Sequence, residues 1–150
     1  MYMKTKKSIL LIFSALFLLT SCRYEDGPFL SFHTPEKRLI TTWSLQKVYR
    51  NGVQTTTPEW YANQIGTYYT FHAYGPLVVT TYHNGTLRES YTGSWQFQNN
   101  EKELKINFIL LDVSYSYIAK IKKLSKTDLE YEYTDINGNL WRLVLYAQSS

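Results

Sequence analysis

Apolar and polar residues alternate through most of the chain after residue 38, in short runs that are separated by turn residues. In one such run Leu129, Tyr131 and Tyr133 alternate with polar, mostly acidic neighbours. A period of two is typical of a β-strand that buries one face. The pattern predicts eight strands, over residues 39–49, 67–72, 77–83, 86–97, 104–108, 115–124, 129–133 and 140–146.

Short connections join the predicted strands. Three of them contain the pairs Asn51-Gly52, Asn84-Gly85 and Asn137-Gly138, and an Asn-Gly pair between two strands is a strong signal for a tight hairpin. Gly93 lies inside a predicted strand and indicates a bulge or a bend. Residues 58–64 are the one segment expected to be helical, because a proline followed by an acidic residue is typical of a helix start.

Eight antiparallel strands with one apolar face each must stack as two sheets or close into a barrel. Closure removes the exposed edges, and at eight strands it leaves an interior that side chains fill or that holds one small ligand. Sequential hairpins favour closure over a Greek-key sandwich, which needs long crossing connections. We therefore expect an all-β fold, an eight-stranded antiparallel up-and-down barrel with one short helix between strands one and two.

The first residues of the chain have the layout of a secretory signal. Three lysines precede an apolar run over residues 9–19, which is about 11 residues long, whereas a membrane-spanning helix needs roughly 20. The run ends in Leu19-Thr20-Ser21-Cys22, which resembles a bacterial lipobox. That resemblance implies removal of residues 1–21 and acylation of Cys22, for example with palmitate. The alternative is an ordinary secretory signal peptide next to which Cys22 lies by chance.

These features divide the chain into a signal peptide at 1–21, a lipidated tether at 22–38 and one barrel domain at 39–150. Removal of the signal leaves 13 basic and 12 acidic residues, a net charge of +1. A near-neutral domain lacks the excess of positive charge that binds a phosphate backbone, so we expect no nucleic-acid partner. Cys22 is the only cysteine, so its acylation would leave no thiol for a disulfide or a metal.

Several aromatic motifs resemble those of a known family. The chain is similar to the small lipocalin-like lipoproteins of Bacteroidetes in the stretches 42–45, 69–71, 93–97, 104–106 and 121–124. Those proteins carry one Gly-x-Trp in the first strand and another near mid-chain. The second is present as Gly93-Ser94-Trp95, but Thr41 stands where the first glycine would be. The resemblance implies a lipocalin-like barrel that is anchored in the cell envelope, at the outer membrane.

The predicted register points a set of aromatic side chains into the barrel. In a small barrel such residues line a ligand cavity or simply fill the interior. We expect a ligand site formed by Trp43, Phe71, Trp95, Tyr117, Tyr131 and Tyr133, with Trp60 and Tyr61 in the helical segment as a lid or as an anchor for the helix. Tyr68 and Tyr82 are expected on the outside, where they could contact another protein or a glycan.

No catalytic or metal-binding pattern stands out. The histidines, at positions 33, 72 and 83, have no carboxylate at a spacing suited to a metal site. The sequence has no nucleophile elbow and no phosphate-binding glycine motif. We therefore expect no catalytic residues, no metal and no cofactor. The predicted function is binding of a small, partly apolar ligand; the alternative is a structural or interaction protein of the envelope whose filled barrel contacts another protein or a glycan.

Overall fold

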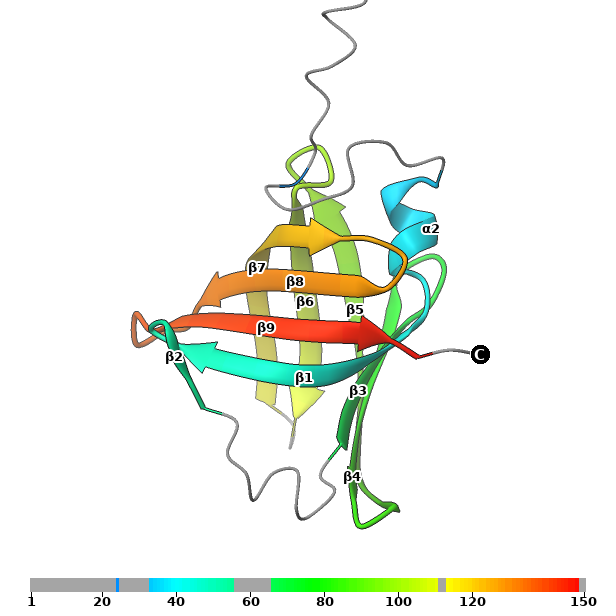
Figure 1. Cartoon of the computed structure of the whole chain (residues 1–150), viewed down its shortest axis with the longest axis vertical. Coiled ribbons are helices and arrows are strands. Elements are labelled where there is room, and N and C mark those ends of the chain that lie inside the picture. The colour runs from blue at the N-terminus through cyan, green and yellow to red at the C-terminus, as the bar shows by residue number, and fades with distance from the viewer. Residues whose placement is uncertain (1–23, 25–32, 56–65, 111–112, 149–150) are drawn as a thin grey trace, which may run out of the picture.

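The computed structural model describes residues 24, 33–55, 66–110 and 113–148. In this part of the chain one short helix precedes a set of antiparallel strands (Figure 1). The elements are α2 Pro35–Leu39, β1 Thr42–Arg50, β2 Val53–Gln54, β3 Gly66–Phe71, β4 Pro76–His83, β5 Thr86–Gln98, β6 Glu103–Leu110, β7 Val113–Leu124, β8 Asp128–Thr134 and β9 Leu140–Ala147.

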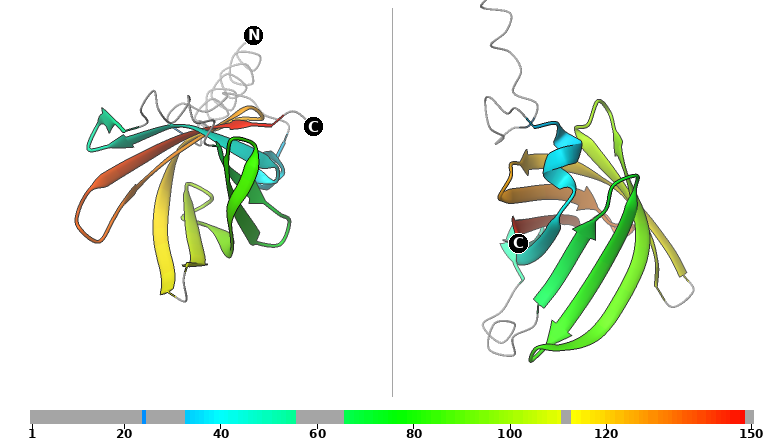
Figure 2. Two further views of the ribbon diagram at one scale, coloured as in Figure 1. Left: turned by 90° about the horizontal axis from the view of Figure 1, so that it is seen from below. Right: turned by 90° about the vertical axis from the view of Figure 1, so that its right-hand side faces the viewer.

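The sheet closes into a barrel because its first long strand pairs with its last. The strands follow one another as β1-β3-β4-β5-β6-β7-β8-β9, and β1 also pairs with β9 from Trp43↔Ala147 to Arg50↔Trp141. The short β2 only extends the hairpin at the end of β1. Figure 2 shows the sheet curling round on itself. The predicted eight-stranded up-and-down barrel is therefore confirmed.

The strand positions agree with the alternating pattern to within a few residues. Positive φ angles of 51° at Asn51 and 49° at Asn84 confirm the tight turns at two of the Asn-Gly pairs, because such turns need left-handed backbone. Gly93 was predicted to form a bulge or a bend. It forms no bulge, because it pairs in continuous register with Leu77 and Phe108. A Cβ on Gly93 would lie 2.2 Å from the carbonyl oxygen of Asn107, so the glycine permits close approach of β5 and β6.

The helix α2 corrects the interpretation of residues 35–38 as part of a tether without regular structure. Thr34 caps the helix by accepting a hydrogen bond from the backbone N–H of Lys37, and Pro35 occupies the first turn, where its fixed φ suits a helix start. Leu39 is fully buried. The helix expected over residues 58–64 lies outside the described residues. No helix within the described part is long and apolar enough to cross a membrane.

Polar groups that would otherwise be orphaned are paired at the end of the barrel beside α2. The indole N–H of Trp43 donates to the Leu39 carbonyl at 2.9 Å, and that of Trp95 donates to the His72 carbonyl at 3.0 Å. Arg38 is buried and donates from Nη1 to the Leu124 carbonyl at 2.6 Å. Since buried donors need partners, these bonds fix the tryptophans and α2 in place. This end of the barrel, which we term the floor, is closed.

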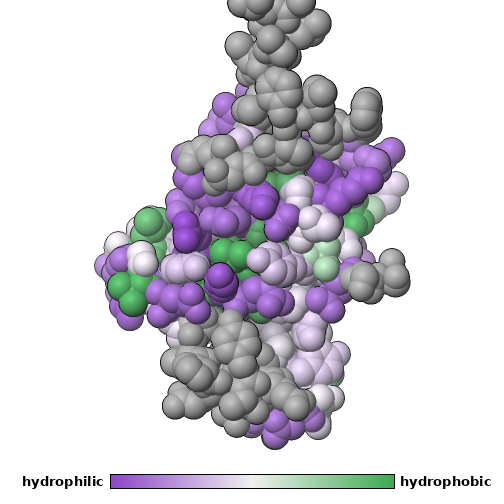
Figure 3. All heavy atoms as spheres, in the orientation of Figure 1, coloured by the Kyte–Doolittle hydropathy of each residue, from purple (hydrophilic) through white to green (hydrophobic). Residues whose placement is uncertain are grey.

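The core lies directly on the floor. Its largest fully buried side chains are Trp43, Tyr131, Phe71, Leu39, Leu77, Leu104, Ile106, Leu124, Leu129 and Leu145. Apart from Leu39, which lies in α2, they lie on the inward face of their strands, so the predicted inward face is confirmed. Outside the barrel, Lys122 pairs with Glu132 at 3.9 Å and Arg142 with Glu130 at 3.4 Å. The surface over β8 and β9 is accordingly mainly hydrophilic (Figure 3).

Candidate ligand-binding site

Above the floor, the interior of the barrel is lined by tyrosines. Tyr69 on β3 pairs with Trp43, and Tyr131 on β8 pairs with Leu143, so both side chains share the face of the buried core. Tyr117 and Tyr133, on β7 and β8, follow toward the end of the barrel opposite the floor, which we term the open end. We term Tyr69, Tyr117, Tyr131 and Tyr133 the tyrosine belt.

Ring contacts hold part of the belt in place. Tyr117 stacks on Tyr133 with ring centroids 4.1 Å apart and planes inclined by 25°, and it meets Phe108 edge-on at 6.3 Å. Phe108 in turn stacks on Tyr115 at 5.5 Å. Such offset and edge-to-face pairs are favourable beyond the area that they bury. They form a continuous aromatic wall from the buried core to Tyr115, whose side chain is 43% exposed.

The belt carries hydroxyl groups into a region that is otherwise apolar. Burial raises the pKa of Tyr69, of Tyr117 and of Tyr131. Electrostatic interaction with a neighbouring phenol raises each pKa further, from Tyr133 at Tyr69, from Tyr69 at Tyr117 and from Tyr117 at Tyr131. All of these phenols are therefore neutral over the physiological pH range and can both donate and accept a hydrogen bond.

One of these hydroxyls has no partner. The Oη atom of Tyr131 is buried and makes no hydrogen bond with the described residues. The neighbouring Tyr117 hydroxyl influences the pKa of Tyr131, but its distance and angle to the Tyr131 hydroxyl fall short of a normal hydrogen bond. A buried polar group without a partner costs on the order of 1–3 kcal/mol. Its retention in an apolar barrel is the strongest sign of a site for a polar group.

Charged side chains occupy the open end beyond the belt. The guanidinium of Arg50 lies 5.6 Å from the ring centre of Trp141. The indole N–H of Trp141 donates to Asp135 at 2.8 Å, and this bond, with that from the Asn139 backbone, lowers the pKa of Asp135 to about 2. These contacts hold the Trp141 ring between a cation and a carboxylate at the start of β9.

A second polar pair faces the interior from β5. Glu89 lies opposite Thr81 and Tyr91 lies opposite Val79, a residue packed against the core. The hydroxyl of Tyr91 donates to the Glu89 carboxylate, and this bond raises the pKa of Tyr91. The exposed carboxylate of Glu89 therefore lies on one side of the open end.

The residues expected at the ligand site fall into separate layers. Trp43, Phe71 and Trp95 are 0%, 1% and 7% exposed and pack into the core; Trp95 meets Phe71 edge-on at 5.9 Å. Tyr131 lies directly above them, and Tyr117 and Tyr133 reach further toward the open end. Trp60 and Tyr61 lie outside the described residues. The structure therefore brings the three tyrosines together, but it places the three other aromatics at the floor.

Part of the aromatic wall was not among the expected site residues. Tyr69, Phe108 and Tyr115 belong to it, and Tyr91 lies on the same face of the sheet. Their alternation with outward residues was a usable signal. The pairing of Phe108 with Tyr115 depends on the register between two strands, which neither strand's sequence shows by itself.

The described residues contain no group of three or more histidine, cysteine, aspartate or glutamate side chains that could hold a metal ion. The site built from these residues is instead an arrangement of neutral phenols, aromatic rings and a few charges at its edge. Such a lining can bind a molecule by apolar contact and orient it with hydrogen bonds.

Comparison with known proteins places the fold. No family model matches the chain, and no curated protein matches its sequence. A lipocalin-like protein from Bacteroides uniformis superposes with a TM-score of 0.53 at 13% identity, covering 74% of this chain and 99% of the other. The barrel is lipocalin-like.

Two further solved structures are similar to this chain in fold. An uncharacterized protein from Bacteroides eggerthii matches with a TM-score of 0.51 at 11% identity, over 73% of this chain and 99% of its own. A redesigned β-barrel matches with a TM-score of 0.50 at 15% identity, over 80% of this chain and 100% of its own. At these identities the likeness concerns the fold alone, and function has to be argued from the site.

Proposed function

We propose that the protein is a lipid-anchored lipoprotein of the cell envelope whose lipocalin-like barrel binds a small, partly apolar molecule at its open end. The anchor is Cys22, at the end of a signal peptide over residues 1–21, and the membrane is the outer membrane. The role is one of binding rather than of catalysis. Two independent parts of the chain support the two halves of this proposal.

The binding half is carried by the unpartnered hydroxyl of Tyr131. This group lies at the boundary between the packed core and the tyrosine belt. A ligand with one hydrogen-bonding group could satisfy it while its apolar part lies along Tyr117 and Phe108. Because the belt contains no charge, the buried part of the ligand is neutral. Arg50 and Glu89 at the open end would accommodate a polar or zwitterionic head.

A thermal-shift screen tests the binding half. The full-length protein in detergent is heated with a panel of fatty alcohols, fatty acids and aromatic alcohols. At least one compound should raise the Tm, since a ligand at 100 times its Kd stabilises the folded state by about 2.7 kcal/mol. The shift should be lost in Tyr117→Ala and kept in Tyr74→Ala, which removes a fully exposed side chain. A flat response across the panel would count against the proposal.

The anchoring half is supported by the lipobox at residues 19–22 and tested by Cys22→Ala. Two acyl chains meet the two signals that stable attachment requires, and three exceed them; each buried methylene contributes about 0.8 kcal/mol. The wild-type protein should incorporate labelled palmitate in its host and enter the membrane fraction. Cys22→Ala should lose both properties. Continued partitioning of this variant into detergent would refute the acylated anchor.

A further inference from the structure

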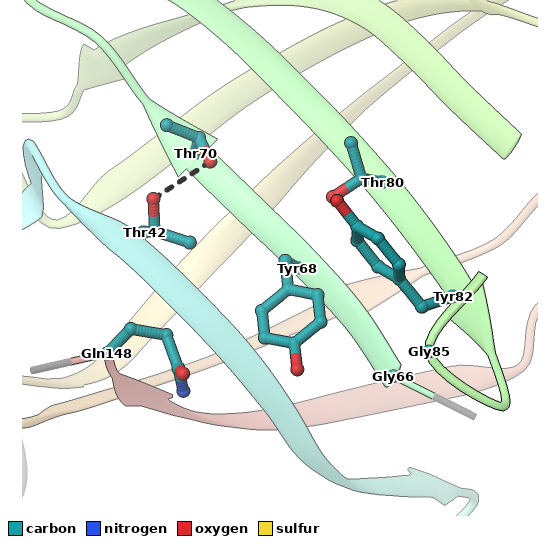
Figure 4. A pocket seen from close by; sticks show the side chains of 8 residues that line it. All are labelled: Thr42, Gly66, Tyr68, Thr70, Thr80, Tyr82, Gly85 and Gln148. Carbon is teal, nitrogen blue, oxygen red and sulfur yellow. Dashed lines mark hydrogen bonds between the residues drawn. The ribbon is translucent and has the colours of Figure 1, made fainter. Parts of the chain in front are cut away.

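A groove lies on the outer face of the barrel, across the start of β1 and the length of β3 and β4. Its volume is about 670 Å³, which falls within the range of small-molecule sites. Figure 4 shows the Tyr68 ring between the β1 and β3 ribbons, with Tyr82 facing it from β4. This surface is separate from the tyrosine belt, since Tyr68 and Tyr69 point to opposite faces of β3.

The groove exists because two neighbouring strands diverge. β1 and β3 pair over only three positions, from Thr42↔Thr70 to Ser44↔Tyr68. β3 and β4 stay paired over six positions, to Gly66↔Tyr82. Beyond Tyr68 the β1 and β3 backbones are therefore no longer neighbours in the sheet. The Tyr68 ring lies over this divergence and folds back over Gly66, where a Cβ would approach its Cε2 atom to 2.9 Å.

The described residues that line the groove are uncharged. It combines two tyrosine rings with threonine hydroxyls and one carboxamide, from Tyr68, Tyr82, Thr42, Thr70, Thr80 and Gln148. No lysine, arginine, aspartate or glutamate lines the groove among the described residues. Tyr68 and Tyr82 meet edge-to-face at 5.7 Å, with their planes inclined by 84°. Thr42 and Thr70 share a hydrogen bond of 3.0 Å, which leaves lone pairs on both oxygens for another donor.

We propose that this groove binds a neutral oligosaccharide. Polyhydroxylated rings need several donors and acceptors, which the hydroxyls and the Gln148 amide supply. The weakly positive C–H bonds of a pyranose ring pack on the electron-rich face of a tyrosine. An uncharged lining offers no ion pair to an anionic lipid headgroup or a charged peptide. An acyl chain would in turn cover the threonine hydroxyls without satisfying their remaining lone pairs.

Isothermal titration of the full-length protein in detergent tests this site. The probes are maltohexaose, cellohexaose and mannohexaose, with hexagalacturonate as the anionic comparator. At least one neutral hexaose should bind with a Kd below about 10 mM. Tyr68→Ala and Tyr82→Ala should each weaken that binding about tenfold, whereas Tyr74→Ala should not change it. Hexagalacturonate should bind more weakly than the best neutral probe.

A fourth variant tests the geometry without removing any groove side chain. In Gly66→Ala the new methyl displaces the Tyr68 ring, because the two would otherwise lie 2.9 Å apart, and binding should weaken as in Tyr68→Ala. The proposal is overturned if no neutral hexaose binds, if binding survives both tyrosine variants, or if hexagalacturonate binds as well as the neutral probes. These outcomes are distinct from failure of the interior site, for which the Tyr117→Ala thermal shift is the readout.

Discussion

Replacement of Tyr131 by phenylalanine should stabilise the protein. The side chain is fully buried, and its hydroxyl has no hydrogen-bond partner among the described residues. Tyr131→Phe keeps the ring and its packing on Leu143 but removes the unpaired polar group. The cost of such a group is about 1–3 kcal/mol. Relaxation of neighbouring side chains recovers part of this cost, so we expect a gain in the free energy of unfolding of about 1 kcal/mol.

Urea unfolding of the ligand-free protein, followed by tryptophan fluorescence, measures this gain. The transition midpoint should rise while the slope m stays unchanged, because the buried area is the same. The Tm should rise by about 4 °C per kcal/mol in a domain of this size. Tyr133→Phe is the matched control. Its ring stacks on Tyr117, but the side chain is only partly buried, so removal of its hydroxyl should change stability by less than about 0.5 kcal/mol.

The opposite sign would refute the reasoning. If Tyr131→Phe destabilises the ligand-free protein by more than about 1 kcal/mol, the hydroxyl makes a hydrogen bond in solution. The belt would then be a satisfied structural network, and the main argument for a ligand would be lost. If the variant is more stable and also loses the thermal shift given by a ligand, the hydroxyl is retained for binding at the expense of stability, as the proposed function requires.

The remaining predictions concern the floor and the turn near Trp141. Trp95→Ala should lower the free energy of unfolding by about 3–5 kcal/mol, because Trp95 is 7% exposed and contacts Phe71 and Phe97; a loss below about 0.5 kcal/mol in urea unfolding would show that it is not a core residue. The pKa of Asp135 is lowered from 3.8 to about 2, below its unfolded value, so its contribution to stability is present above pH 4 and lost as the pH falls toward 2. Asp135→Asn should remove that part of the acid dependence of the Tm, whereas an acid profile identical to wild type would contradict it.

Much of the fold could be predicted because a half-buried strand has a simple signature. Trp43, Ile106 and Leu145 each occupy an alternate position, and all three are buried as expected. The closed meander followed from the number of strands and the short turns between them. These features depend only on neighbours in the sequence, which is why the sequence alone was sufficient.

Features that depend on distant contacts could not be predicted in this way. The helix α2 is only five residues long, and the hydrogen bond from Arg38 to Leu124, 86 positions away, helps to hold it. A segment with two nearby prolines and no sustained period therefore looked like a linker. Gly93 was interpreted as a bulge or a bend because the close approach of Asn107 is visible only across the strand pair.

The candidate sites show the same division. The pattern placed Tyr117, Tyr131 and Tyr133 correctly on the inner face, but it could not separate this layer from the packed floor that contains Trp43. The layer to which a residue belongs depends on how far along its strand it lies from the floor beside α2. The outer groove was also out of reach, because it results from the divergence of β1 and β3 after Ser44↔Tyr68. The outward orientation of Tyr68, however, was predicted.

Native mass spectrometry of the protein, extracted from host membranes in mild detergent, detects both the acyl anchor and a bound ligand. We expect an acylated chain that begins at Cys22 and retains, in part of the population, one small molecule that activation in the gas phase releases. The Tyr117→Ala variant should retain less of this molecule. A wild-type protein that is free of bound small molecules in every preparation would contradict a ligand-binding barrel.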